Sequence, residues 1–118
     1  MSRSWELFLR DMLEAARKII RYTGNRQVEA FVADEMAYDA TLRNLEILGE
    51  AAKKIPEEIR QRYPTVDWRG VAGLRDILAH AYFALDNPTL WQIVRTDIPR
   101  LLDLLGQIES DLLGQLGP

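Results

Sequence analysis

The amino-acid sequence predicts an all-α protein, an up-and-down bundle of four to six helices. Two features support this prediction. Apolar residues recur at steps of three and four, as on the buried face of a helix, and no stretch shows the period-two alternation of a strand. At 118 residues, 47% of them hydrophobic, the chain has the size and composition of one globular domain, which we expect to span residues 1–118.

The first half of the chain predicts two long helices that pack antiparallel. The first covers about residues 4–22, and its apolar face consists of Trp5, Phe8, Met12, Ala15, Ala16, Ile19 and Ile20. A short helix over 27–32 follows, and Asp34 is suited to cap the second long helix, which we expect over 35–55 with Pro56 as its stop. This helix has two apolar stripes, so it should be buried on more than one side and be the central helix.

The next part of the chain predicts a short helix over 56–62 and then a longer one. Asp67 looks suited to cap the longer helix, which should end close to His80 and pack across the long pair. Gly70 and Gly73 lie inside it and cost about 1 kcal/mol each relative to alanine. Their presence predicts that another backbone approaches the helix closely.

The last part of the chain predicts two further helices. Pro88 starts one that reaches about Arg95. Thr96 and Asp97, followed by Pro99, predict a break and a restart, after which the final helix continues to about Gln115. Acidic residues interrupt its leucines, so we interpret it as an amphipathic helix and not as a membrane anchor.

Composition excludes several kinds of chemistry. With no cysteine and one histidine, the chain has no thiolate nucleophile, no disulfide and no cysteine-ligated zinc, and a protein-built zinc site is disfavoured. We therefore expect metal-independent chemistry and no cofactor. Charged residues interrupt the amino terminus before an apolar stretch of signal-peptide length develops, which predicts a cytoplasmic protein without membrane association.

The charge is unevenly distributed. The net charge of −3 argues against nonspecific coating of nucleic acid. Residues 53–75 nevertheless hold six basic and three acidic side chains, a local +3 that leaves −6 for the rest of the chain. This basic strip is compatible with a phosphate-bearing ligand or with a solvated charged face.

The most informative segment is the octapeptide Arg-Asp-Ile-Leu-Ala-His-Ala-Tyr, from Arg75 to Tyr82, which holds the single histidine in the pattern Arg-x4-His-x-Tyr. His80 is the one side chain with an ordinary pKa near neutrality, so it is the candidate general acid or base. Arg75 offers a planar fork of donors that matches a phosphate. Asp76, four residues before His80, is placed to hydrogen-bond the imidazole and favour its protonated form.

These residue types suit the cleavage of RNA. The 2′-hydroxyl of RNA is an internal nucleophile, so a site needs a base, charge stabilisation and help for the leaving oxygen, without a metal. On a regular helix, at about 100° per residue, His80 and Tyr82 point nearly oppositely. The helix should therefore end near His80, or the two residues serve different roles. The alternative is a histidine stabilised by the helix dipole beside a solvated Arg75 and Asp76.

One histidine is few for a reaction that uses both a base and an acid. This suggests two copies of the motif facing each other across a two-fold homodimer interface. Asn44 is a supporting candidate on an apolar stripe of the central helix, where we interpret it first as a core amide bonded to a neighbouring helix.

Besides the octapeptide, several other segments of the chain are informative when they are taken together. They are Leu-Arg-Asn-Leu-Glu-Ile-Leu-Gly-Glu-Ala-Ala at 42–52, Arg-Tyr-Pro at 62–64, Trp-Arg at 68–69, Ala-Gly-Leu-Arg-Asp at 72–76 and His-Ala-Tyr-Phe at 80–83. In this combination the chain resembles the HepT-type branch of the HEPN ribonuclease family, the toxin of HepT/MntA toxin-antitoxin pairs.

The resemblance implies a HEPN-like helical domain, a homodimer with its cleft at the interface, and metal-independent endoribonuclease activity on RNA. It implies Arg75, His80 and Tyr82 as the active site, and a minimal nucleotidyltransferase (MntA-like) antitoxin as partner. In related systems the antitoxin transfers AMP from ATP to the motif tyrosine, here Tyr82. The alternative is a noncatalytic HEPN module that binds a nucleotidyltransferase partner or a nucleotide.

Overall fold

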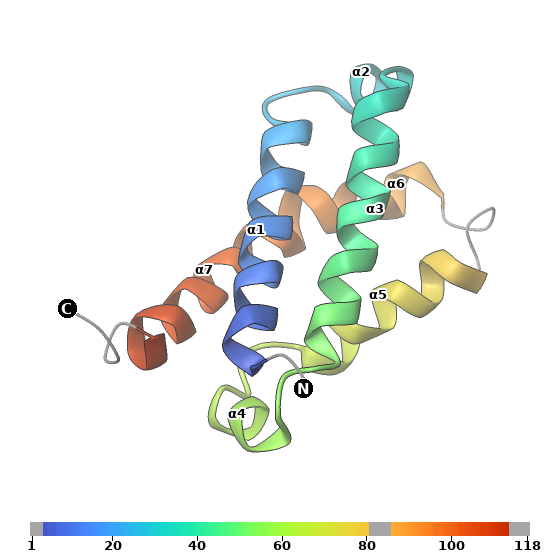
Figure 1. Cartoon of the computed structure of the whole chain (residues 1–118). Helices are drawn as coiled ribbons and strands as arrows, with labels where there is room; N and C mark the ends of the chain where they lie inside the picture. The colour runs from blue at the N-terminus through green and yellow to red at the C-terminus, as the bar shows by residue number, and fades with distance from the viewer. Residues whose placement is uncertain (1–3, 81–85, 114–118) are drawn as a thin grey trace.

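A computed structural model describes residues 4–80 and 86–113, without the side chains of 77–80 and 113. Its helices, shown in Figure 1, are α1 (Trp5–Thr23), α2 (Val28–Ala33), α3 (Glu35–Ala52), α4 (Glu57–Arg62), α5 (Trp68–His80), α6 (Asn87–Gln92) and α7 (Ile98–Ile108), with the π-helical segments η1 (Ile93–Asp97) and η2 (Glu109–Leu113). The described residues form no strand, and the all-α prediction is confirmed.

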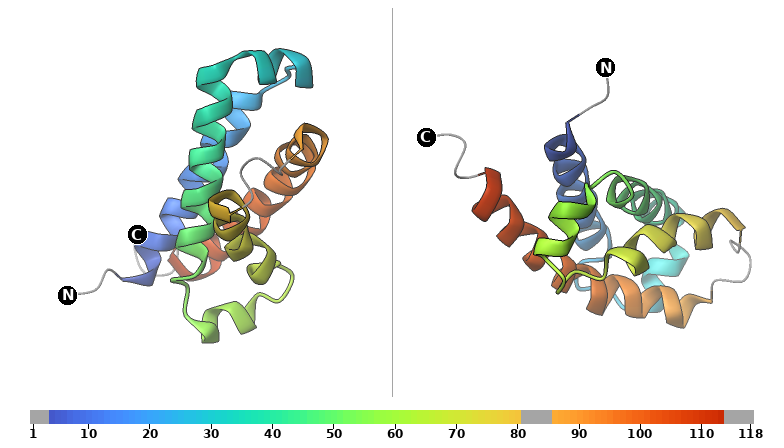
Figure 2. Two further views of the ribbon diagram at one scale, coloured as in Figure 1. Left: turned by 90° about the vertical axis from the view of Figure 1, so that its right-hand side faces the viewer. Right: turned by 90° about the horizontal axis from the view of Figure 1, so that it is seen from below.

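The long helices α1 and α3 lie side by side in opposite directions and form the centre of the fold (Figures 1 and 2). Helix α5 packs across the carboxyl-terminal half of α3, and α7 packs against α1. The core between them is apolar, and its largest fully buried side chains are Leu9, Met12, Leu13, Ile19, Phe31, Leu45, Leu48, Ile55, Leu90, Ile98, Leu105 and Ile108. None of these described helices is long and apolar enough to span a membrane.

The buried face of α1 is rotated from the predicted one. Leu9 and Leu13 are buried although the predicted stripe left them out, whereas Trp5, Phe8 and Ile20 are only partly buried. The reason is that α1 packs on two partners, α3 and α7, so its buried surface is wider than one stripe.

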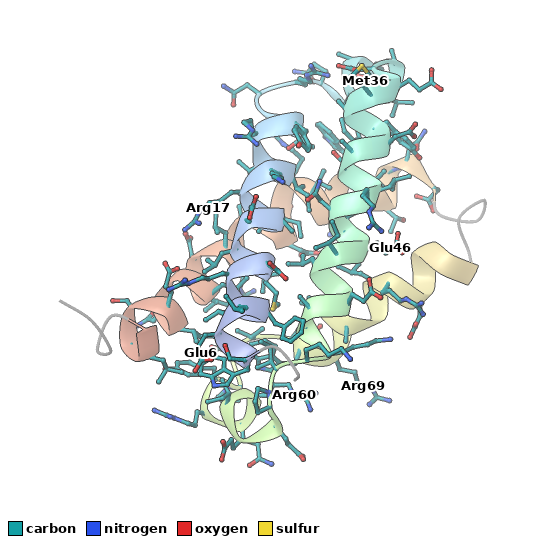
Figure 3. All side chains as sticks on the ribbon, in the orientation of Figure 1. Glu6, Arg17, Met36, Glu46, Arg60 and Arg69 are labelled. Carbon is teal, nitrogen blue, oxygen red and sulfur yellow. The ribbon has the colours of Figure 1, made fainter. Side chains whose placement is uncertain are left out.

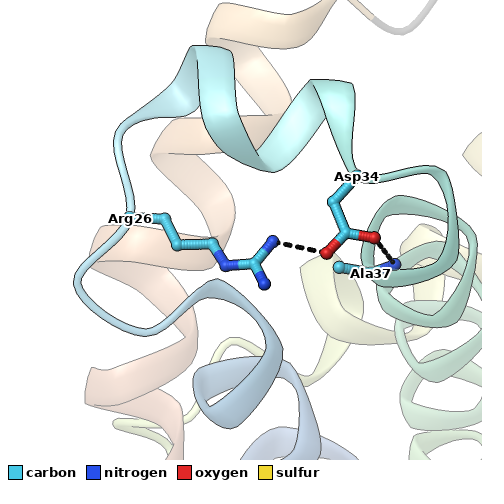
Figure 4. Close-up of polar contacts among 3 residues, drawn as sticks. All are labelled: Arg26, Asp34 and Ala37. Atoms are coloured by element: carbon cyan, nitrogen blue, oxygen red, sulfur yellow. Dashed lines mark hydrogen bonds and ion pairs between the residues drawn. The ribbon is translucent and has the colours of Figure 1, made fainter.

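The corner before α3 is fixed by Asp34, as the sequence predicts. Its Oδ1 accepts the backbone N–H of Ala37 at 3.1 Å, and its Oδ2 accepts a hydrogen bond from Arg26 Nη1 at 2.8 Å (Figure 4). The bond from Arg26, helped by the Ala37 N–H, lowers the pKa of the Asp34 carboxyl below its usual 3.8. The cap therefore stays ionised at neutral pH and joins the α1–α2 connection to the start of α3.

The helix α3 ends at Ala52, three residues before the predicted end at Ile55. The backbone N–H groups of Lys54 and Ile55 donate to carbonyls three residues back, Ala51 and Ala52, so the last turn is tighter than an α-helix. Pro56 is the cap of α4, which begins at Glu57, one residue after the predicted start, and ends at Arg62 as predicted.

The predicted break before Pro99 is wrong. Asp97 and Ile98 have helical backbone angles, and α6, η1, α7 and η2 follow one another without interruption from Asn87 to Leu113. In η1 the N–H of Ile98 donates to the carbonyl of Ile93, five residues back. A proline ring clashes with the carbonyl four residues earlier, and the wider π-helical turn relieves that clash without ending the helix.

The predicted close approach at Gly70 and Gly73 is also wrong. A Cβ atom added at Gly73 would meet nothing within 4 Å, and one at Gly70 would meet the Asp67 side chain that caps α5. The close approach is instead at Gly49 of α3, where an added Cβ would lie 2.8 Å from the backbone nitrogen of Arg75 and 2.9 Å from the carbonyl oxygen of Val71. Gly49 therefore sets the distance between α3 and α5.

Candidate active site

The start of α5 is anchored by two hydrogen bonds. Asp67 Oδ1 accepts the backbone N–H of Gly70 at 3.0 Å, which confirms Asp67 as the cap. The buried Trp68 donates its indole N–H to the carbonyl of Tyr63 at 3.0 Å. These contacts fix where the helix begins and hence the direction in which it passes over Gly49 towards the motif.

Arg75 lies where α5 crosses α3. Its backbone nitrogen faces Gly49, and its side chain reaches solvent with 40% of its area exposed. Its Nη1 lies 3.6 Å from Asp76 Oδ1, an ion pair too long for a good hydrogen bond. A guanidinium carries five N–H donors, so Arg75 keeps donors for an incoming anion.

Asp76 contacts Lys53 at the carboxyl-terminal end of α3. Lys53 Nζ donates to Asp76 Oδ1 at 3.2 Å. This hydrogen bond, with a smaller contribution from Arg75, lowers the pKa of the Asp76 carboxyl below its usual 3.8. An ionised Asp76 thus stands between two cations, and its described partners are Lys53 and Arg75.

His80 is the last residue of α5, and its side chain lies outside the described residues, as does the whole of Tyr82. The predicted helix up to His80 is confirmed. Residues 76 and 80 are four apart and share one face of the helix. The contact between Asp76 and the His80 imidazole, and the divergence of His80 from Tyr82, stay predictions.

Asn44 is 8% exposed, which agrees with the prediction of a core amide. Its predicted partner on a neighbouring helix is wrong, because Asn44 Nδ2 donates to the carbonyl of Ala40 in α3 itself, at 2.8 Å. A polar side chain in the middle of a helix can bond four residues back and so avoid the cost of burial. No described hydrogen bond joins Asn44 to Arg75 or Asp76.

Sequence reasoning missed Lys53 and Gly49 as site residues. Lys53 belongs to the basic strip, but its pairing with Asp76 depends on how α5 packs on α3. Gly49 sits inside a long helix, and the cost of a helical glycine was a signal that could have found it. In the described part of the chain, no three acidic, histidine or cysteine side chains are grouped so as to hold a metal ion.

A model of the family described as "Ribonuclease HepT-like" matches residues 12–108 of this chain. The match covers α1 from Met12 onward and the whole of α3 and α5, and the chain belongs to the HepT-like ribonuclease family. The resemblance inferred from the sequence segments is thereby confirmed.

Individual relatives agree with this assignment. A protein of Methanocaldococcus jannaschii named "Putative RNase MJ1216" is 38% identical over 113 residues, which cover 96% of this chain and 93% of the relative. A Thermococcus cleftensis protein named "Probable ribonuclease HepT" is 42% identical over 101 residues, covering 86% and 92%. No solved structure matched the chain significantly.

Proposed function

We propose that this chain is the toxin of a toxin-antitoxin pair and a metal-independent endoribonuclease whose catalytic residues are Arg75, His80 and Tyr82. The supporting observation is Arg75, which is half-exposed at the crossing of α5 and α3 and keeps donors unoccupied beside Asp76. The family and the names of its relatives supply the reaction class, cleavage of RNA.

The proposed chemistry uses the 2′-hydroxyl of RNA as nucleophile. His80 takes the proton of this hydroxyl, the 2′-oxygen forms a bond to phosphorus, and the bond from phosphorus to the 5′-oxygen breaks. Arg75 stabilises the negative charge that accumulates on the phosphoryl oxygens in the transition state. The leaving 5′-oxygen takes a proton, and the products are a 2′,3′-cyclic phosphate and a 5′-hydroxyl.

A homodimer would supply the second proton-transfer group. Each chain holds one histidine, whereas the reaction uses a base at the 2′-oxygen and an acid at the 5′-oxygen. Two motifs in one interface would place two copies of His80 and Arg75 around one phosphate. Tyr82 would position the RNA, and Asp76 would hold the His80 imidazole and Arg75 in place.

The experiment for this proposal is cleavage of total RNA by the purified chain in EDTA, with mapped ends and sedimentation in parallel. We expect cyclic-phosphate ends, a dimer, and impaired growth of cells that express the chain alone. Intact RNA and normal growth would favour the noncatalytic module that binds a partner or a nucleotide. A strictly monomeric chain that still cleaves RNA would contradict the shared site.

We further propose that a minimal nucleotidyltransferase antitoxin neutralises the chain by transferring AMP from ATP to the phenolic oxygen of Tyr82, with release of pyrophosphate and of the phenolic proton. The added phosphate and adenosine would occupy the anion site beside Arg75 and repel RNA. After incubation with the partner and ATP, peptide mass spectrometry should show Tyr82 heavier by one or more AMP groups and the RNA intact. An unmodified Tyr82 in a fully neutralised complex would mean that the partner acts by occlusion.

A further inference from the structure

A second cationic surface lies next to the motif. The end of α3, the helix α4 and the first turns of α5 enclose an open groove of about 770 Å³. Lys53, Arg60 and Arg69 line it together with Glu57 and Asp76, and we call it the α4–α5 groove. Figure 3 shows Arg60 and Arg69 at the same end of the bundle.

Two of its cations have donors to spare. The Nε of Arg60 is buried and makes no hydrogen bond, although a buried guanidinium N–H normally has a partner. Arg69 is exposed, and among the described residues neither arginine forms an ion pair. Arg69 is therefore available to an external anion, and the partly buried Arg60 lines the same groove without an ion-pair partner among the described residues.

The acidic residues of the groove are already engaged. Asp76 accepts from Lys53 at 3.2 Å, and Glu57 Oε1 accepts from Gln61 Nε2 at 3.4 Å. The three cations Lys53, Arg60 and Arg69 exceed the two carboxylates of Glu57 and Asp76 by one charge, and Lys53 is paired with Asp76. The groove should attract a ligand with several negative charges.

The groove is continuous with the proposed catalytic site. Arg69, Gly73 and Asp76 lie three or four residues apart on one face of α5, and position 80 continues the same face at about 100° per residue. At Gly73 the space above the backbone is open, since an added Cβ would meet nothing within 4 Å. A bound single-stranded polyanion that passes position 80 can therefore follow α5 past Gly73 to Arg69.

We propose that the α4–α5 groove binds the phosphodiester backbone of single-stranded RNA beside the cleaved bond, with Arg60 and Arg69 as the phosphate-binding residues. The inference rests on the proposed ribonuclease function. Arginine forks match phosphate oxygens, and basic grooves that track a backbone are the usual means of holding single strands.

The test measures binding separately from cleavage. The probe is a fluorescently labelled single-stranded RNA with 2′-O-methyl groups throughout, which removes the internal nucleophile, and anisotropy is recorded over a range of salt concentrations. Replacing both arginines, Arg60→Gln with Arg69→Gln, should raise the Kd about tenfold and reduce the slope of log K against log salt by about 1.4. Arg69→Gln alone, at an exposed position, should reduce the slope by about 0.7.

The matched control is the pair Arg10→Gln and Arg17→Gln, which removes the same charge from exposed positions of α1. Figure 3 labels Arg17, away from Arg60 and Arg69. The inference would be overturned if both pairs of substitutions weakened RNA binding equally, or if the groove variants bound RNA as tightly as the wild-type chain. Loss of antitoxin binding with RNA binding unchanged would overturn it in favour of a protein site. If the groove variants lose RNA binding but the wild-type chain cleaves nothing, the groove stands and the ribonuclease proposal fails.

Discussion

The variant His80→Ala should cleave RNA about 10²- to 10⁴-fold more slowly than the wild-type chain and should no longer impair growth, because it removes the proposed general acid-base group. His80 is the last residue of α5, so the substitution interrupts no described helix, and we expect the helical circular dichroism spectrum and the Tm to stay close to those of the wild-type chain. The measurement is single-turnover cleavage of a defined RNA with excess protein, so that weaker RNA binding does not appear as slower chemistry.

Two variants make this result interpretable. Arg17→Ala removes an exposed polar side chain from α1 and should cleave at the wild-type rate. Arg75→Ala should slow cleavage at saturating protein and leave the fold intact, because its side chain is half-exposed. Wild-type rates in a clean His80→Ala preparation would remove His80 from the mechanism.

The sequence predicts those parts of the fold that depend on local chemistry. Asp34 and Asp67 cap helices because a short carboxylate bonds to free N–H groups three residues on, a contact that needs no tertiary partner. The apolar periodicity also predicts that the two long helices pack antiparallel and that α3 is central, because the spacing of apolar residues along a helix shows which faces are buried. What local chemistry leaves open is the packing angle, and Leu9 and Leu13 were missed because α7 widens the buried face of α1.

In the candidate site too, some features follow from the local sequence and others only from the packing of the helices. Arg75 and Asp76 could be chosen from the sequence because their residue types and spacing suit a phosphate. Lys53 is 23 residues from Asp76 in the chain, so their 3.2 Å contact exists only once α5 is packed on α3. Four glycines lie inside helices and carry the same local signal. Only the packed structure separates Gly49, which faces a backbone, from Gly70, Gly73 and Gly106, which do not.

Gly49→Ala is the second substitution with a large expected effect, since it tests how the fold positions the motif. The new Cβ would lie 2.8 Å from the Arg75 nitrogen and 2.9 Å from the Val71 carbonyl oxygen, closer than a carbon atom is tolerated. Both neighbours are backbone atoms of α5, so the helix must move away. We expect a loss of about 1 to 3 kcal/mol in the free energy of unfolding, measured by urea denaturation.

Gly106→Ala is its matched control. Gly106 also lies inside a helix, α7, but an added Cβ there would meet nothing within 4 Å. The same substitution should therefore stabilise the chain by roughly 0.5 to 1 kcal/mol, because alanine is the better helix former. If the free energy of unfolding falls in Gly49→Ala and rises in Gly106→Ala, the effect at position 49 comes from the contact between α3 and α5 and not from helix propensity.

The movement of α5 should also affect the site. Arg75 is the residue that the new methyl group would displace, and a misplacement of about 1 Å can cost 10²-fold in rate. In an assay well below its Tm, Gly49→Ala should thus lose more RNA-cleaving activity than the loss of folded protein explains. Gly106→Ala should cleave RNA at the wild-type rate. Full activity with full stability in Gly49→Ala would mean that α3 and α5 tolerate a wider spacing, and that the position of Arg75 does not depend on this contact.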